Sequence, residues 1–440
     1  MNRLLRSVFF CLAALLAVYA ALFANYLHAT GESVFHAKNI WVGLAGTIFF
    51  ALAGWRFSPG AKFKIFAVLL SLLAVELVLQ AAAWLGVLPA VNIARKAPFA
   101  RVYWTAEGRG NGIRNRFGWY YPPFDLKAAH KIAFIGNSQV EGLEVLRGQN
   151  QAADLQKLLK EKSPDWAVLG LGSHGSCPAQ AIEVLEYVWR YFQPQEAILV
   201  VSLGNDISAA SAKLHLVPAD QYIYYDLDAG GNLVLNPASA PGRERYNQAL
   251  DRNHRSLLFN LPFILYSHCM LLQLADSLRD DLQKRHQRAE LVARGNGALA
   301  NGFNTTLFAV NPSPDAQRAL KILLAQLQQC KNVCDSHGMK FRLVTLPAFP
   351  QVFYDSQHGR DWTMHIGDCD YLGPERVIAA WARTNGIPVI PLGEVLQQEK
   401  MAVADIRSLY FLGGTGHLTV KGHAFCAQTI YDRFYRPTLP

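Results

Sequence analysis

The chain has 440 residues, a formal net charge of +9 and only 17% charged residues. This length predicts about two or three structural units. Apolar residues crowd into the first ninety positions, so we place a boundary near residue 90. The Lys and Arg residues are dispersed and form no basic run interleaved with aromatic residues, which argues against nucleic-acid binding. We attribute the excess charge to membrane orientation and surface, and an anionic polymer partner stays open.

Three apolar stretches in the first ninety residues predict membrane-spanning helices. They are Ser7–Ala29, Ile40–Trp55 and Ile65–Leu88. The first follows basic residues as a signal peptide would, but it is too long for one and no clean small-residue cleavage site follows it. At about 1.5 Å per residue it can cross a hydrocarbon core of about 30 Å. We therefore expect three uncleaved spans.

Basic residues predict the orientation of these spans. They lie before the first span and between the second and third, whereas the loop between the first and second has one: Arg3 and Arg6, then Arg56, Lys62 and Lys64, against Lys38. Because such residues favour the cytoplasmic side, the N-terminus is expected inside and the chain after Leu88 outside. The expected location is the bacterial cytoplasmic (inner) membrane, with a periplasmic or extracellular domain.

Two polar residues interrupt the third span. Glu76 and Gln80 lie four residues apart, on one helical face. Such residues are costly against lipid and usually face protein or water. A functional role is conceivable, but we favour packing against Asn25, Tyr26 or another polar position of the helix bundle.

The seven cysteines define no site. Six follow Cys11 and could form disulfides in an oxidising compartment, although no spacing proves it. Cys330 and Cys334 fall on one helical face, where we expect two half-buried thiols. No CxxC pair or His/Cys cluster indicates zinc, and we expect no metal and no cofactor.

From Lys131 onward, short apolar runs alternate with amphipathic segments. This alternation predicts an α/β fold of three layers, with a parallel sheet between helices as in flavodoxin-like proteins. We divide the chain into a membrane anchor (1–90), a linker or lead-in (91–130) and an α/β domain (131–440). An insertion at about 212–312 contains a predicted hairpin around Gly230-Gly231 and a long helical stretch from Asn253 to Gly295.

Four segments with chemically capable residues follow predicted strands or lead into a helix. They are Asn137-Ser138-Gln139-Val140-Glu141-Gly142, the glycine-rich Gly170–Gln180, Ser202-Leu203-Gly204-Asn205-Asp206, and Gly413–His423 before the last helix. Parallel strands bind ligands at their carboxyl ends. Ser138 is the candidate nucleophile, and His417 in the fourth segment is the candidate base.

Together these segments resemble the SGNH (GDSL-like) hydrolases. GNSQVEG matches their first block, and the later blocks align with Gly175, Asn205 and His417. The resemblance covers about 130–212 and 313–435. It implies that Ser138 attacks an ester carbonyl and His417 takes its proton. It also implies an oxyanion hole formed by the backbone N–H groups of Ser138 and Gly175 and the side chain of Asn205.

Two positions depart from that pattern. Asn137 replaces the Asp that normally precedes the serine, and Gly414 and Thr415 stand where the acidic residue before the histidine is expected. A Ser-His dyad remains open, with His417 held by a backbone carbonyl, by Thr415 or by a distant carboxylate. The candidates for that carboxylate are Asp405 and Asp368. His174 is a possible substrate contact or base, although a solvent-facing position is favoured, and His423 is expected to be structural.

The sequence therefore predicts a membrane-anchored serine esterase or deacylase that acts on O-acyl groups of an extracytoplasmic glycan or lipid. One alternative is a polysaccharide O-acetyltransferase that works with a membrane partner supplying the acyl group. Another is a non-catalytic glycan-binding or assembly component that retains the fold.

Overall fold

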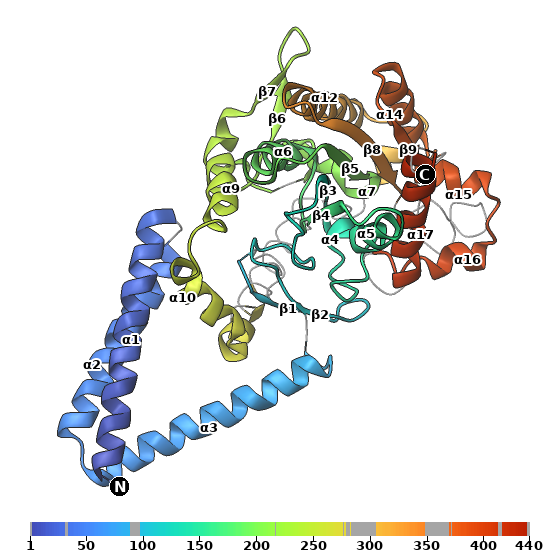
Figure 1. Ribbon diagram of the computed structural model, residues 1–440. Helices are drawn as coiled ribbons and strands as arrows, with labels where there is room; N and C mark the ends of the chain where they lie inside the picture. Colours follow the sequence, from blue (N-terminus) through green and yellow to red (C-terminus); the bar gives the residue numbers. More distant parts are fainter. Residues whose placement is uncertain are drawn as a thin grey trace.

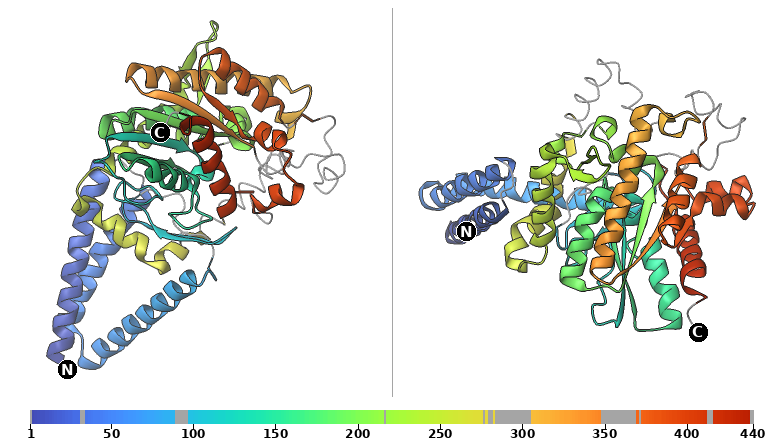
Figure 2. Two further views of the ribbon diagram at one scale, coloured as in Figure 1. Left: turned by 45° about the vertical axis from the view of Figure 1, so that its right-hand side comes forward. Right: turned by 90° about the horizontal axis from the view of Figure 1, so that it is seen from above.

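The computed structural model describes residues 2–30, 34–88, 97–215, 217–275, 277–278, 282, 305–347, 369–370, 372–411 and 416–437. Three long helices lie at the N-terminal end, and an α/β domain follows them (Figure 1). The helices extend away from the domain as two arms, one formed by the first two helices and the other by the third, and the arms meet near the N-terminus (Figures 1 and 2).

The N-terminal helices are α1 (Asn2–Thr30), α2 (Val34–Arg56) and α3 (Pro59–Trp84). Helices α1 and α2 pack closely, and a Cβ atom at Gly43 would lie 2.9 Å from the Cβ atom of Ala20. Lys62 Nζ lies 3.5 Å from Asn2 Oδ1, so α1 and α3 begin at the same end of the bundle.

Two of these helices contain stretches long and apolar enough to cross a membrane, Asn2–Ala24 and Pro59–Trp84. The apolar part of α2, Ile40–Arg56, is shorter. Three predicted spans thus correspond to three helices, but two of them meet the length criterion.

The domain is built on a five-stranded parallel sheet in the order β4-β3-β5-β8-β9. The strands are β3 (His130–Gly136), β4 (Trp166–Gly172), β5 (Glu196–Ser202), β8 (Lys340–Leu346) and β9 (Val389–Pro391). The expected parallel α/β sheet is confirmed, and its order is that of flavodoxin-like folds. The strands are runs of buried Val, Ile, Leu and Ala because helices cover both faces of the sheet.

Helices α5 (Gln151–Lys162) and α17 (Val420–Ile430) contact each other on one side of the sheet. On the other side α6 (Pro178–Phe192) contacts α12 (Pro314–Ser336), and α12 contacts α14 (Gly373–Thr384). Cys330 and Cys334 on α12 are fully buried free thiols, not half-buried ones. Shorter helices complete the domain: α4 (Ser138–Glu141), α7 (Leu203–Ala209), α8 (Ala212–His215), α15 (Leu392–Gln398), α16 (Val403–Ser408) and a π-helical turn at Tyr431–Tyr435.

The lead-in segment contains an antiparallel hairpin of β1 (Arg101–Trp104) and β2 (Gly110–Ile113). Its turn lies against residues 143–145, where Arg109 N donates to Glu144 O at 2.8 Å. Gly108 in that turn has a φ of +62°, and a Cβ atom there would lie 2.3 Å from Glu144 O. Only glycine combines that conformation with such a close approach.

The insertion begins with a hairpin of β6 (Tyr225–Leu227) and β7 (Leu233–Leu235), followed by α9 (Ala240–Arg252) and α10 (Leu257–His268). The hairpin around Gly230-Gly231 forms as predicted. The helical stretch from Asn253 is not continuous, because Cys269 leaves the helical conformation at φ −88°, ψ 105°. A new helix begins at 270, and the rest of the predicted stretch lies largely outside the described residues.

Candidate active site

Strand β3 presents Ser138 at its carboxyl end. Asn137 is the N-cap of α4, with an extended backbone, and its side chain accepts a hydrogen bond from Gln139 N. Ser138 therefore occupies the first helical position of a sharp strand-to-helix turn. Its backbone N–H donates no hydrogen bond to any residue that the structure describes, as expected of the first turn of a helix.

His417 lies beside Ser138, and the distance between Ser138 Oγ and His417 Nε2 is 2.9 Å. Ser138 is 6% and His417 5% exposed. The two residues are 279 positions apart in the chain. The folded sheet thus brings together a hydroxyl and an imidazole in the arrangement that activates a serine nucleophile.

The other ring nitrogen of His417, Nδ1, contacts the Glu107 carboxylate. Glu107 lies in the turn of the β1–β2 hairpin and is 7% exposed. The backbone N–H groups of Gly416 and His417 also donate to Glu107 Oε2, at 3.2 and 3.4 Å. Glu107 thus holds both the imidazole ring and the backbone that carries it.

Glu107 is not among the acidic residues that the sequence suggested as partners of His417. Asp405 lies 3.6 Å from Lys421 Nζ on the exposed surface, and both side chains are more than half exposed. Asp368 and Thr415 lie outside the described residues. The acidic partner comes instead from the segment interpreted as a linker, because the hairpin folds back over the carboxyl edge of the sheet. An acidic residue flanked by glycine in that segment was the only available signal, and such a signal is weak.

The environment of His417 favours the protonated imidazole. Burial alone would lower its pKa, but the hydrogen bond to Glu107 and the charges of Glu144, Glu107 and Glu141 act in the opposite direction. The net effect raises the pKa of His417 above its ordinary value of 6.5. The same carboxylates would stabilise an imidazolium formed when the serine loses its proton.

Gln139 holds the histidine loop in place, a role that the sequence did not indicate. Its Nε2 donates to Gly416 O at 3.3 Å, and its Oε1 accepts from Leu418 N at 3.2 Å. These two bonds flank His417 on both sides. Because Gln139 directly follows Ser138, these bonds tie Ser138 and His417 together through neighbouring residues.

Asn137 points away from the reacting atoms and into a buried network. Its Nδ2 donates to Asp206 Oδ1 at 3.1 Å, and its Oδ1 accepts from Ser202 Oγ at 3.1 Å. Burial raises the pKa of Asp206 to about 7, although hydrogen bonds from Ser202 N and Asn137 act against the rise. An amide at position 137 can donate to this carboxylate, whereas an Asp would place two carboxylates side by side.

The loop after β4 carries Gly175 at a φ of +70°. Among the described residues, the N–H of Gly175 donates no hydrogen bond, and its carbonyl accepts one from Tyr222 Oη at 2.9 Å. The preceding residue, His174, donates its backbone N–H to Glu141 Oε2 at 2.7 Å. Glu141 also forms a buried ion pair of 2.7 Å with Arg114, so a fixed charge pair anchors this loop.

Two further predicted site residues lie at the surface of the domain. Asn205 is exposed in the first turn of α7, which directly follows β5. The His174 side chain is also exposed, and its ring centroid lies 6.1 Å from that of Trp104. Trp104 in turn meets His417 edge-on with centroids 6.3 Å apart, so the Trp104 indole contacts both histidine rings.

His423 is fully buried in α17. Its Nδ1 accepts a hydrogen bond from Gln151 N at 3.3 Å, and its Nε2 lies 2.9 Å from Glu144 Oε1. These contacts connect α17 to α5 and to the segment against which the β1–β2 turn packs. They agree with the expected structural role of His423.

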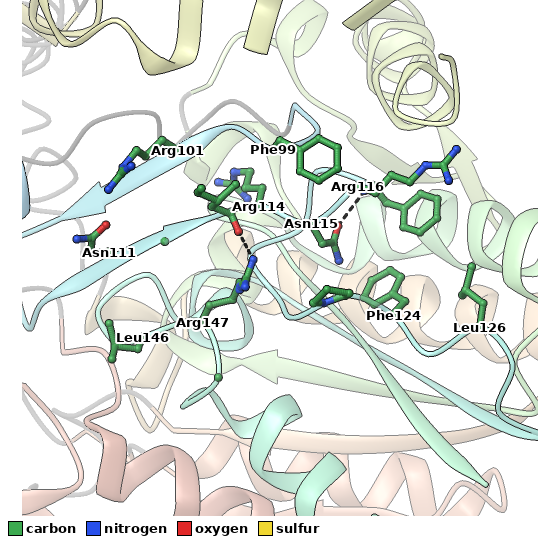
Figure 3. Close-up of a pocket in the computed structure, with 15 residues that line it drawn as sticks. Phe99, Arg101, Asn111, Arg114, Asn115, Arg116, Phe124, Leu126, Leu146 and Arg147 are labelled. Carbon is green, nitrogen blue, oxygen red and sulfur yellow. Dashed lines mark hydrogen bonds between the residues drawn. The ribbon is translucent and has the colours of Figure 1, made fainter. Parts of the chain in front are cut away.

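A separate pocket of about 870 Å³ lies at the base of the same hairpin (Figure 3). Its lining includes Arg101, Arg116 and Arg147, together with Phe99 and Phe124. Arg147 donates to Ile113 O at 2.6 Å. Neither Ser138, Glu107 nor His417 lines this pocket. The hairpin therefore carries the Glu107 turn at one end and a basic hollow at the other.

Comparisons with known proteins identify no family for this chain. No family model and no curated protein matches it. Among solved structures, a mutant acetyl-xylooligosaccharide esterase from Geobacillus is similar at 12% identity, with a TM-score of 0.32, 72% of this chain covered and 98% of that one. A catalytic mutant of an acetylxylan esterase from Geobacillus stearothermophilus is similar at 12% identity and a TM-score of 0.32, covering 70% and 94%.

Within the residues that the structure describes, no group of three or more His, Cys, Asp or Glu side chains could hold a metal ion.

Proposed function

We propose that this chain is a serine ester hydrolase of the SGNH type that removes O-acyl groups from an extracytoplasmic glycan or lipid. The observation that carries the proposal is the connected series Ser138, His417 and Glu107. His417 is placed to accept the serine proton while the Oγ atom attacks the acyl carbonyl. Glu107 fixes the ring so that Nε2 faces the serine, and it stabilises the imidazolium that results.

The acyl-enzyme pathway follows from this order of residues. Attack by Ser138 Oγ breaks the ester bond, and the alkoxide of the glycan or lipid leaves with the proton returned by His417. Water then attacks the acyl-serine with His417 again as base, which releases a carboxylic acid and restores the hydroxyl. In both acylation and deacylation, the proposed donors to the oxyanion are the N–H groups of Ser138 and Gly175 and the side-chain amide of Asn205.

The alternative of a non-catalytic component rested on the missing acidic residue before His417. Glu107 supplies a carboxylate from another part of the chain. We therefore rank catalysis above binding without turnover. The acetyltransferase alternative uses the same acyl-serine, but a membrane partner supplies the acyl group and a glycan hydroxyl accepts it in place of water.

The test is labelling with a fluorophosphonate, which reacts with activated serines. The wild-type protein is expected to be labelled at Ser138, Ser138→Ala is expected to lose the label, and the matched control Ser208→Ala on neighbouring α7 should keep it. Absence of labelling in folded wild-type protein would refute the proposal. Release of acetate from an acetylated oligosaccharide without a second acceptor then distinguishes hydrolysis from obligatory transfer.

We further propose that α1, α2 and α3 anchor the enzyme in the cytoplasmic membrane with its domain outside. The lengths and apolar composition of α1 and α3 support this, as does the shared end at which they begin. In spheroplasts, added protease should digest the α/β domain, and alkaline carbonate should leave the intact protein in the membrane. Digestion only after lysis would reverse the proposed orientation.

A further inference from the structure

A continuous stretch of the insertion, residues 256–275, contains no Asp, Glu, Lys or Arg. It forms α10, the break at Cys269 and the helix that begins at 270. Figure 1 and the left view of Figure 2 show this segment between the domain-facing ends of α1 and α3. The stretch is therefore an apolar element held next to the proposed membrane anchor.

Polar side chains of this segment face inward and leucines face outward. Asn260, Ser267 and Gln273 are 0%, 1% and 4% exposed, whereas Leu258 and Leu265 are 64% and 52% exposed. In an aqueous environment the hydrophobic effect favours the opposite arrangement. An outward apolar face with polar groups turned inward is expected where the surroundings are hydrocarbon.

Each of the three inward side chains donates a hydrogen bond to a backbone carbonyl of the segment. Gln273 Nε2 donates to Tyr266 O at 2.9 Å, and Asn260 Nδ2 donates to Ser256 O at 3.3 Å. Ser267 Oγ donates to Ile264 O at 2.8 Å. Such bonds allow the segment to leave water without exposing these groups to lipid.

Glu76 and Gln80 on α3 fix the position of the segment. The Glu76 carboxylate accepts from the backbone N–H groups of Met270 and Leu271 at 2.7 and 2.9 Å, and thus caps the helix that begins there. Gln80 Nε2 donates to His268 O at 2.6 Å. The two polar residues predicted to face protein do so, but their partners lie in the insertion. The side chains of Asn25 and Tyr26 are not described.

The depth of this contact follows from helix geometry. Glu76 precedes the last residue of α3, Trp84, by eight positions. At about 1.5 Å per residue, this places Glu76 about 12 Å before the end of the helix. If α3 spans the bilayer, residues 268–271 lie below the outer surface of the membrane.

We infer that residues 257–275 form a membrane-embedded element in the outer leaflet, with acyl chains of lipid as the partner of its leucine face. This inference rests on the proposed membrane anchor. Glu76 has a structural task in it, because its charge caps a helix N-terminus where no water is available. The element joins the α/β domain to the bilayer at a second place, in addition to the end of α3.

Photolabelling of the full-length protein tests the inference. The protein is reconstituted in nanodiscs of phosphatidylcholine with a diazirine on the acyl chain, irradiated and digested, and adducts are mapped by mass spectrometry. Adducts are expected on α1 and α3 and on residues 257–275, but not on α9. Adducts on α1 and α3 without any on 257–275 would overturn the inference and leave the anchor intact. No adducts on α1 or α3 would overturn the anchor and the inference with it.

A pair of variants tests the leucine face specifically. Replacing both leucines in Leu258→Glu/Leu265→Glu is expected to reduce adducts on 257–275 at least several-fold while adducts on α1 and α3 persist. The matched control is Val234→Glu, which changes an exposed residue of the β6–β7 hairpin and should leave the adduct pattern unchanged. Equal adduct yields on 257–275 in the double variant and the control would contradict lipid contact through these leucines.

Discussion

The Glu107 carboxylate contacts Nδ1 of His417, although the two residues are 310 positions apart in the chain. The contact completes a Ser-His-acid series whose acidic member comes from the hairpin before the first strand of the parallel sheet. It also explains how Gly414 and Thr415 can occupy the positions before the histidine without loss of the acidic partner.

Replacing the acidic residue should reduce turnover without unfolding the domain. Glu107→Gln keeps a side chain of similar size but removes the charge that orients and stabilises the imidazole. We expect kcat to fall by about 10⁴-fold, the loss seen when a serine hydrolase histidine loses its carboxylate. Ester hydrolysis by purified protein provides the measurement. Asp405→Asn is the matched control, and a similar loss in that variant would contradict the assignment of Glu107.

The pH dependence of activity should reflect the raised pKa of His417. The imidazole must be neutral to accept the serine proton, so kcat/KM should rise with pH and reach half of its plateau above pH 6.5. In Glu107→Gln the midpoint should move to lower pH, because burial then acts with less opposition. A wild-type midpoint below pH 6.5 would contradict the described environment of His417.

The raised pKa of His417 also contributes to the stability of the fold. This contribution is fully present below about pH 6.5, the pKa of the unfolded histidine, and is lost as the pH rises through the pKa of the folded one.

Introducing at position 137 the Asp that SGNH hydrolases carry before their serine should be harmful here. Asn137→Asp places a second carboxylate beside Asp206, whose pKa is already raised to about 7. The two carboxylates cannot both ionise without repulsion, so the pKa of the pair rises further and the ionised form is destabilised. The melting temperature should therefore fall more at pH 8 than at pH 5. Asn205→Asp, an exposed change at a neighbouring strand end, should show no such pH-dependent difference.

Gln139 should act as a positioning residue. Gln139→Ala removes the bonds to Gly416 O and Leu418 N that flank His417. A small displacement of a catalytic group can cost about 10²-fold, so we expect kcat to fall by roughly that factor with KM nearly unchanged. Gln139→Glu retains the acceptor for Leu418 N but loses the donor to Gly416 O. Its kcat should lie between those of the wild type and Gln139→Ala. Gln149→Ala, which alters a half-buried glutamine with no contact to the histidine loop, should behave as wild type. An effect confined to KM would argue against positioning.

The buried ion pair between Arg114 and Glu141 should contribute strongly to stability. Both side chains are almost fully buried, at 0% and 1% exposure. Glu141→Gln removes the negative charge from this buried pair, and breaking such a pair costs about 3–5 kcal/mol. The measurement is the free energy of unfolding in denaturant. The exposed pair Lys160–Asp125 gives the control, since Asp125→Asn should cost no more than about 1 kcal/mol. Equal losses of unfolding free energy in the two variants would contradict the expected effect of burial.

The sequence by itself determined the elements whose pattern is local. Alternating apolar runs predicted the parallel sheet, since a buried strand and an amphipathic helix each have a period that can be read from neighbouring residues. The same pattern placed Ser138 and Asn205 after β3 and β5, because parallel strands end at one edge of their sheet. The structure confirms this sheet, and it brings Ser138 and His417 within hydrogen-bonding distance.

Only the tertiary structure decided which carboxylate serves His417 and what Glu76 contacts. Glu107 lies in a short hairpin with no distinguishing motif, and its partner depends on how that hairpin folds over the sheet edge. Likewise, Glu76 was recognisable as a polar residue in an apolar helix, but its partners lie 194 and 195 positions later. Side-chain identity and spacing carry no information about such distant packing, so the acidic residue of the candidate site emerged only from the folded chain.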